Sequence, residues 1–352
     1  MISYETVKKV LFKFQPETAH HIAEFGLKTL GRCFILKNIM EKENYIFHPR
    51  LNQKIFDLNF SNPVGLAAGF DKNATMIKAM KSLGFGFTEI GTVTLLPQDG
   101  NPKPRMFRYP EQKSVQNAMG FNNLGAHDVL KNLKKVYPFE IPIGVNIGKN
   151  KITPEEFALS DYKNLIKKFH KTSDYLVINI SSPNTPNLRD LQNEKFITEL
   201  FTMAKTLTTK PILLKIAPDM EVQTAINLCK TAVEAGASGI IATNTTIDYS
   251  LVQNCQNFGG LSGACLTQKS SQLFKEIAQE LFGKTILISA GGISNGAQAY
   301  ERIKNGATLV QAYSGLIFEG PAMVKKINQE ILKLLDKDGF ENIQEAIGAN
   351  LK

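Results

Sequence analysis

A polar loop with two prolines follows a short apolar run near the middle of the chain. The run Tyr175 to Ile178 gives way to residues 179–189, with the sequence Asn-Ile-Ser-Ser-Pro-Asn-Thr-Pro-Asn-Leu-Arg. This change predicts a buried strand that opens onto a surface loop, where α/β proteins place their chemistry. The prolines restrict the loop, so the hydroxyl of Ser182 and the amide of Asn184 can be held with little further loss of entropy. We predict that this is a catalytic loop.

Seven more apolar runs end in residues of the same kinds. Each is followed by, or contains near its end, a small residue, an amide, a hydroxyl or a lysine. Since one polar ligand contacted from all sides would explain this arrangement, we expect the ends of the runs to surround a single site. The residues concerned are Ala68, Gly69, Lys72, Thr92, Asn146, Lys215, Thr243, Asn244, Thr245, Gly292, Tyr313 and Ser314.

The runs themselves predict an α/β fold, a (β/α)₈ TIM barrel with a small N-terminal helical extension. Most are followed by a segment with helical periodicity, such as 220–235 and 295–305. Buried parallel strands are continuous apolar runs joined by helices, and barrel active sites lie at the carboxyl ends of the strands. A doubly wound open sheet is the alternative. The runs are 63–66, 87–94, 143–147, 175–180, 211–216, 239–243, 286–290 and 309–313.

Two glycine-rich run ends predict a phosphate site. Gly291-Gly292 and Ser314-Gly315 would expose backbone N–H groups at neighbouring strand ends, the corner where such barrels commonly bind phosphate. A pair of tight turns is the alternative. Lys215 lies inside an apolar run and needs a negative partner, because a buried ammonium alone is costly. A flavin ring that gains negative charge on reduction would provide one.

The composition is that of a folded protein without a metal site. The chain has 352 residues, 43% of them hydrophobic, and a net charge of +9, with no block of basic residues that would require a nucleic acid or an anionic surface. The four cysteines form no C-x-x-C pair, so no metal is expected. We expect no signal peptide and no membrane-spanning run, and therefore a soluble or peripheral protein in a reducing cytoplasm.

Five longer motifs resemble those of one enzyme family. Over nearly its whole length the chain resembles the dihydroorotate dehydrogenases of the quinone-dependent, membrane-associated class 2. The motifs are several residues long and occur in the family order. They are 65–72 (Gly-Leu-Ala-Ala-Gly-Phe-Asp-Lys), 117–123 (Asn-Ala-Met-Gly-Phe-Asn-Asn), 144–151 (Gly-Val-Asn-Ile-Gly-Lys-Asn-Lys), 179–189 and 310–317 (Val-Gln-Ala-Tyr-Ser-Gly-Leu-Ile).

The resemblance implies an FMN-binding barrel that oxidises (S)-dihydroorotate to orotate in de novo pyrimidine (UMP) biosynthesis. Ser182 would be the general base that removes the C5 proton while a hydride leaves C6 for the flavin, which a membrane quinone then reoxidises. The substrate-binding positions would be Lys72, Asn117, Ala118, Met119, Gly120, Phe121, Asn179, Asn184, Asn244 and Thr245. The FMN-binding positions would be Ala68, Gly69, Thr92, Asn146, Asn179, Lys215, Thr243, Gly263, Gly292, Tyr313 and Ser314.

The chemistry of orotate agrees with these positions. Orotate is a planar ring of carbonyl and N–H groups with one carboxylate, so asparagines match its edge and Lys72 matches its charge. One or two of the asparagines would be explained equally well as turn formers. We also expect the proton to leave by way of Thr185 and a water past Phe121.

One loop departs from the family pattern. Residues 259–263 follow it, but Ala264 and Cys265 stand where relatives usually have a basic residue and a proline. A contact from the Gly263 backbone to a flavin needs no side chain and should be unaffected. We expect Cys265 to be a packed thiol.

The first 45 residues predict two short amphipathic helices ahead of a catalytic barrel at 46–352. Apolar residues recur at helical spacing between 7 and 14 and between 19 and 30, and an apolar tract follows at 34–36. Such helices commonly just pack on a barrel, but the class 2 resemblance implies a membrane-facing pair that admits a quinone tail. His20 and Arg108 would lie near the quinone head. The enzyme would then be peripheral on the cytoplasmic side of the cell membrane.

Three other functions remain open. A tRNA dihydrouridine synthase is also an FMN barrel, but the catalytic cysteine and additional RNA-binding region of that family are not found here, and we expect no nucleic-acid partner. A class 1 dihydroorotate dehydrogenase would have cysteine at position 182 and no N-terminal extension, and both expectations fail for this sequence. A barrel without enzymatic activity that only binds membranes would not copurify with a yellow flavin.

Overall fold

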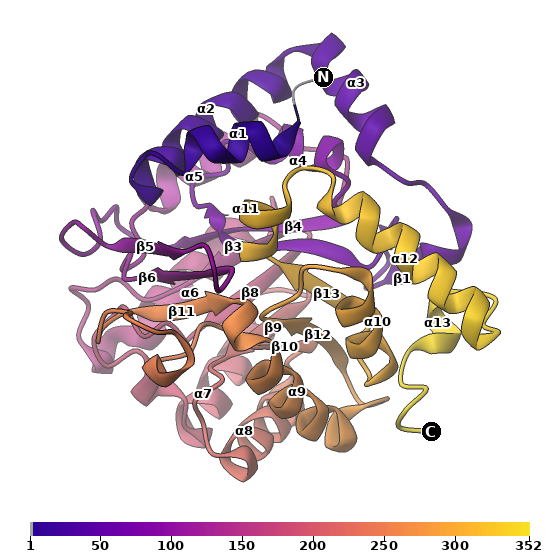
Figure 1. Ribbon diagram of the computed structural model, residues 1–352. Helices are drawn as coiled ribbons and strands as arrows, with labels where there is room; N and C mark the ends of the chain where they lie inside the picture. The colour runs from indigo at the N-terminus through magenta and orange to yellow at the C-terminus, as the bar shows by residue number, and fades with distance from the viewer. Residues whose placement is uncertain (1–2) are drawn as a thin grey trace.

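The structure, a computed structural model, describes residues 3–352 and has a closed barrel of eight parallel strands at its centre (Figure 1). β13 pairs with β3 to close the barrel. Each of the eight predicted runs overlaps one of these strands, so the predicted TIM barrel is confirmed. The strands are β3 (Val64–Asp71), β4 (Phe87–Val93), β7 (Ile143–Ile147), β8 (Tyr175–Asn179), β9 (Ile212–Ile216), β10 (Gly239–Ala242), β12 (Ile286–Ala290) and β13 (Leu309–Ala312).

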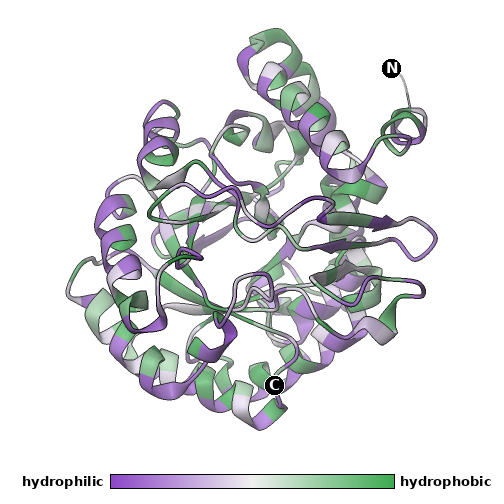
Figure 2. Ribbon diagram, turned by 90° about the vertical axis from the view of Figure 1, so that its left-hand side faces the viewer, coloured by the Kyte–Doolittle hydropathy of each residue, from purple (hydrophilic) through white to green (hydrophobic). Residues whose placement is uncertain are grey.

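Helices form a ring outside the barrel (Figure 2). Their apolar faces pack on the strands, as Leu165 of α6 and Leu228 of α8 do. The helices predicted at 220–235 and 295–305 correspond to α8 and α10. After the barrel begins, the helices are α4 (Ile77–Met80), α5 (Gly125–Lys134), α6 (Ala158–Phe169), α7 (Glu194–Lys205), α8 (Val222–Ala235), α9 (Thr267–Leu281), α10 (Gly296–Lys304), α11 (Ser314–Glu319), α12 (Met323–Asp338) and α13 (Ile343–Ala346).

Aromatic side chains fill the barrel at the amino ends of its strands. A hairpin of β1 and β2 contributes Phe60, which lies edge-on to Phe87 with 5.5 Å between ring centroids. A Cβ atom at Gly65 would lie 2.3 Å from the Phe87 ring, and one at Gly144 would lie 2.4 Å from the Tyr175 ring. These two glycines therefore make room for the aromatic layer, which leaves the opposite end of the barrel for a ligand. The hairpin strands are β1 (Gln53–Ile55) and β2 (Leu58–Phe60).

Three helices precede the barrel, one more than the sequence predicted. They are α1 (Tyr4–Leu11), α2 (Pro16–Arg32) and α3 (Phe34–Asn44). The apolar tract at 34–36 begins α3 instead of following the last helix. Cys33 is extended (φ −92°, ψ 102°) and separates α3 from α2 with a single residue, which periodicity alone does not reveal.

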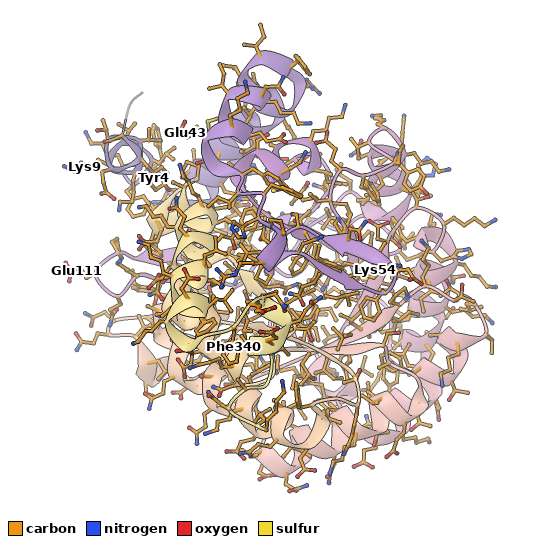
Figure 3. All side chains as sticks on the ribbon, turned by 90° about the vertical axis from the view of Figure 1, so that its right-hand side faces the viewer. Tyr4, Lys9, Glu43, Lys54, Glu111 and Phe340 are labelled. Atoms are coloured by element: carbon orange, nitrogen blue, oxygen red, sulfur yellow. The ribbon has the colours of Figure 1, made fainter. Side chains whose placement is uncertain are left out.

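Polar contacts fix these helices on the barrel. Glu17 of α2 pairs with Arg105 at 2.8 Å, and the Thr75 hydroxyl donates to Glu24 of α2 at 2.9 Å. Tyr4 of α1, labelled in Figure 3, donates to the carbonyl of Ile317 in α11 at 2.7 Å. This contact joins the first helix to the helix that follows the eighth barrel strand.

A small antiparallel sheet stands at the carboxyl ends of the barrel strands (Figure 1). The sequence analysis did not predict it, because its strands have four residues each and show too little alternation to be recognised. It brings Asn117 from β6 and Gly263 from β11 to the same edge as the barrel strand ends. The strands are β5 (Met106–Tyr109), β6 (Ser114–Asn117) and β11 (Gly260–Gly263), in the order β11-β6-β5.

Candidate active site

A cavity lies at the carboxyl ends of the barrel strands and is lined by most of the predicted site residues. Ala118 and Asn146 are buried and do not line the cavity, and neither do His20, which belongs to α2, and Arg108, which contacts the segment after α1. The predicted residues that line the cavity are Ala68, Gly69, Lys72, Thr92, Asn117, Met119, Gly120, Phe121, Asn179, Ser182, Asn184, Lys215, Thr243, Asn244, Thr245, Gly263, Gly292, Tyr313 and Ser314.

A hydrogen-bonded group of side chains from β4, β7 and β8 forms one wall. Thr92 donates to Asn146 Oδ1 at 2.6 Å, and Asn179 Nδ2 donates to the same oxygen at 3.1 Å and to the Thr92 hydroxyl at 2.9 Å. The Tyr162 hydroxyl holds the carbonyl of Asn179 from the helix side at 3.0 Å. The peptide bond before Thr92 is cis. Asn146 Oδ1 is therefore the shared acceptor that orients Thr92 and Asn179, which face the cavity.

Ser182 lies in the loop after β8, with 6% of its surface exposed. Its Oγ accepts a hydrogen bond from the backbone N–H of Asn184 at 3.2 Å. Asn184 Nδ2 in turn donates to the carbonyl oxygen and to Oδ1 of Asn117, each at 3.1 Å. Within residues 3–352 the Ser182 hydroxyl donates to no protein acceptor. Its proton is therefore free for a group in the cavity.

The glycine-rich corner predicted for phosphate has a left-handed backbone without side chains of its own, and the Thr267 and Ser270 hydroxyls donate to the carbonyls of Gly292 at 2.9 Å and Gly291 at 2.8 Å. Gly291 and Gly292 have φ values of 109° and 75°. A Cβ at Gly292 would lie 2.5 Å from the Cα of Thr267 at the start of α9, so only glycine fits. The hydroxyls of Ser262 and Ser314 lie 2.9 Å apart on the neighbouring wall. The corner therefore offers backbone and hydroxyl groups of the kind that bind phosphate.

A buried arginine supports this corner from behind. Arg302 is 1% exposed and donates to the Thr267 carbonyl at 2.7 Å, to Ser270 Oγ at 2.9 Å and to Ser289 Oγ at 3.0 Å. Burial lowers the pKa of Arg302 to about 10, so it remains a cation at neutral pH. Its charge lies close to the site where an anionic group would bind.

Lys215 and Glu89 are opposite charges inside the barrel. Lys215 lines the cavity from β9, and Glu89 is fully buried on β4. The Glu89 carboxylate accepts a hydrogen bond from the Gln311 amide, while its Oε2 has no partner among the described residues. Burial raises the pKa of Glu89 and lowers that of Lys215, and the charge of each counteracts the shift of the other. The sequence analysis identified Lys215 but missed this protein counter-charge.

Lys72 lines the cavity and lies near His20 of α2. Burial lowers the pKa of Lys72 to about 8, although the carboxylates of Glu17 and Glu24 oppose the shift. Burial also lowers the pKa of His20 to about 3, and nearby Lys72 adds to this effect. The His20 ring lies edge-on to Phe70 with 5.2 Å between centroids. His20 is therefore neutral at neutral pH.

Arg108 joins β5 to the segment between α1 and α2. Its guanidinium lies 4.0 Å from the centroid of the Phe12 ring and donates to the carbonyls of Phe12 at 3.2 Å and Phe14 at 2.9 Å.

Among residues 3–352 we find no group of three or more His, Cys, Asp or Glu residues able to hold a metal ion.

Comparison with known proteins identifies the family. A family model described as dihydroorotate dehydrogenase matches residues 50–335, most of the chain. The chain belongs to the dihydroorotate dehydrogenase family. It is 60% identical over 350 residues to a dihydroorotate dehydrogenase (quinone) from Sulfurovum sp., covering 99% of both chains. It is 51% identical over 349 residues to another from Helicobacter acinonychis, again covering 99% of both.

Solved dihydroorotate dehydrogenase structures share the fold over almost the whole chain. The ligand-free enzyme from Eimeria tenella superimposes with a TM-score of 0.86 at 35% identity, covering 96% of this chain and 99% of that one. The complex of the Eimeria tenella enzyme with ferulenol gives a TM-score of 0.85 at 35% identity, covering 95% of each chain. Family membership establishes a flavin-dependent oxidoreductase.

In this member of the family, several residues that shape the cavity were not singled out by the sequence analysis. Gln311 lies in the middle of an apolar strand, and Ser262 lies in a short strand that was not predicted. Lys113 and Glu319, which are 206 residues apart in the sequence, form an ion pair at 2.8 Å at the rim of the cavity. A polar residue inside an apolar run was a usable signal for Gln311, as it was for Lys215.

Proposed function

We propose that this chain is a quinone-dependent enzyme that oxidises (S)-dihydroorotate to orotate in pyrimidine biosynthesis. One observation carries the proposal. A single cavity brings together the Ser182 hydroxyl, four asparagines and the Lys72 ammonium in a chain 60% identical to a relative named for this activity. The asparagines are Asn117, Asn179, Asn184 and Asn244.

We propose that the flavin is FMN and that it binds in the deeper part of the cavity. Lys215 and Thr92 would face its ring system, and the corner at Gly292 and Ser314 would hold its phosphate. The Cβ-free backbone at Gly292 and the ammonium of Lys215, which donates to no protein acceptor in the described chain, support this fit. When bound, FMN supplies the hydride acceptor of the reaction. The remaining predicted positions are Ala68, Gly69, Asn146, Asn179, Thr243, Gly263 and Tyr313.

The substrate would bind against the asparagines, because each offers both a donor and an acceptor to the edge of a pyrimidine ring. Lys72 supplies the positive charge that the carboxylate of dihydroorotate requires. The loop 117–121 borders the same cavity. Asn244 Nδ2 donates to Ser181 Oγ at 2.9 Å, so its side chain is already oriented before a ligand binds.

Ser182 would accept the proton from C5 of dihydroorotate as the general base. A hydroxyl needs a route by which the proton can leave. The Thr185 hydroxyl in the same loop is buried and has no hydrogen-bond partner among residues 3–352, so it is free to take part in such a route. Phe121 lines the cavity nearby.

We propose that residues 1–45 form the quinone- and membrane-facing region and residues 46–352 the catalytic domain. Large apolar side chains between 39% and 76% exposed gather on the N-terminal helices and the turn after α1. His20 and Arg108 would lie near the quinone head. The exposed residues are Val7, Val10, Phe14, Ile22, Phe25, Phe34, Ile35, Leu36 and Ile39.

These apolar faces support peripheral contact with the cytoplasmic side of the cell membrane. Basic residues on the same segment, such as Lys9 and Lys13, would meet anionic headgroups. None of the helices within residues 3–352 combines the length and the apolar character that crossing a bilayer requires.

The proposal is tested by observing the two half-reactions separately. The purified yellow protein is mixed anaerobically with dihydroorotate and then with a quinone, and the flavin absorbance is followed. We expect the flavin to bleach and then to recover. A flavin that stays oxidised with dihydroorotate would refute the proposed activity, and one that bleaches but does not recover would refute the quinone as acceptor.

A further inference from the structure

One guanidinium ties the loop that carries Ser182 to the loop after β10. Arg189 Nε donates to the carbonyl of Ser181 at 3.0 Å, and its Nη2 donates to the carbonyl of Thr245 at 2.9 Å. Its Nη1 pairs with Asp219 Oδ2 at 2.9 Å. Arg189 does not itself line the cavity. It therefore acts on a ligand through the residues that it holds.

Asp219 is the anchor of this arrangement. Besides Arg189, it accepts hydrogen bonds from the Thr246 hydroxyl and from the backbone N–H of Ile247 at 3.0 Å, and it pairs with Lys269 of α9 at 3.0 Å. Its side chain is 13% exposed. These donors hold the pKa of Asp219 below its usual value despite burial, so it is anionic at neutral pH.

The contact between Arg189 and the Ser181 carbonyl matters most for the position of Ser182. The Ser181 carbonyl belongs to the peptide group that leads into Ser182, so fixing this oxygen fixes the start of the Ser182 backbone. The Ser181 hydroxyl is held separately by Asn179 and Asn244. Thr245, on the other side of the same guanidinium, lines the cavity beside Asn244. One side chain thus sets the distance between Ser182 and the residues proposed to bind substrate.

We infer that Arg189, anchored by Asp219, is a positioning residue that places Ser182 at C5 of the substrate. The inference rests on the proposed function. A planar guanidinium can reach three acceptors in fixed directions, which an ammonium cannot. Displacement of a reacting group by about 1 Å costs about 10²-fold in rate. Loss of the guanidinium should therefore slow proton removal selectively, while the flavin site, which it does not touch, stays intact.

The test compares Arg189→Lys and Asp219→Asn with the parent enzyme. Lys230→Met is the matched control, because it removes an ion pair of similar length, to Glu280 at 2.6 Å, on the outer helices. Flavin reduction is followed anaerobically with dihydroorotate that carries deuterium at C5 or at C6. We expect both site variants to keep their flavin and to be reduced about 10- to 100-fold more slowly. Their isotope effect should rise at C5 relative to C6, because proton removal becomes the slower event.

Reduction of both site variants at the parent rate, or an unchanged ratio of the two isotope effects, would overturn the inference. A purely structural role would lower flavin content or thermal stability in the site variants without changing that ratio. Ser182→Ala separates this inference from the function on which it rests. If Ser182→Ala is reduced at the parent rate, Ser182 is not the base and the proposed mechanism fails. If it is slow while Arg189→Lys and Asp219→Asn are fast, only the positioning role fails.

Discussion

The lowered pKa of Lys72 predicts that substrate affinity falls at a pH where an ordinary lysine would still be fully charged. Lysine is cationic below its pKa, so its attraction for the substrate carboxylate is complete at low pH and is lost as pH rises. With a pKa of about 8 in the free enzyme, the dissociation constant of orotate should rise about tenfold between pH 7 and 9 and about 100-fold by pH 10. An unshifted lysine would weaken binding by only a few per cent at pH 9.

The assay is a titration of the oxidised enzyme with orotate, followed by the flavin absorbance, from pH 6.5 to 10. Lys72→Arg is the control, because a guanidinium stays protonated throughout this range. Any ionisation of orotate itself affects both proteins equally. We expect the affinity for orotate to fall above pH 8 in the parent enzyme. This fall should be absent in Lys72→Arg. Parallel profiles for the two proteins would show that Lys72 does not supply the charge that binds the carboxylate.

Four further outcomes are expected. Ser182→Ala should retain flavin and bind orotate but lose about 10²–10⁴-fold in the rate of flavin reduction, measured by stopped flow. Lys215→Met should lower flavin retention on gel filtration and lower the flavin potential, because Glu89 is left as an unpaired buried carboxylate, and adding Glu89→Gln should recover part of the loss. Deletion of residues 1–45 should leave reduction by dihydroorotate intact but sharply slow reoxidation by a long-tailed quinone in vesicles. The deletion should slow reoxidation by a small soluble acceptor to a smaller extent. His20 has a folded pKa of about 3, below the ordinary 6.5. The unfolded chain therefore protonates His20 more readily than the folded chain, and the free energy of unfolding should fall as pH drops from 6.5 toward 3, by about 1–2 kcal/mol at pH 5. His20→Asn should flatten this dependence of the unfolding free energy on pH, measured by urea unfolding.

The barrel and most of the cavity lining were predictable because each depends on residues close together in the sequence. A buried parallel strand leaves a continuous apolar run, and the site residues follow each run directly. Ser182, Lys215 and Gly292 were found in this way, and the structure places all three at the cavity. Their roles remain proposals that the experiments above test.

The features that sequence reasoning missed depend on pairs that only folding brings together. Glu89 and Gln311 meet across β4 and β13, which are separated by most of the barrel sequence. Arg189 finds Asp219 in the loop of the next barrel unit. In each case the pairing could not be identified from periodicity and spacing, even for Gln311, which stands out as a polar residue inside an apolar run. The short helix boundary at Cys33 was missed for a different reason, because one extended residue leaves no mark on an apolar pattern.

The contact between Tyr4 and Ile317 has a consequence for the order in which the protein is assembled during synthesis. Translation proceeds from the N-terminus, so α1 leaves the ribosome long before the residues of α11 that it binds. Closure of the barrel also waits for β13. The face of α1 that this contact covers must therefore stay unpaired through almost the entire synthesis of the chain, whereas α2 finds its partners Thr75 and Arg105 much earlier. In the cell, this interval is when the nascent protein is most exposed to chaperones, to aggregation and to premature contact with a lipid surface.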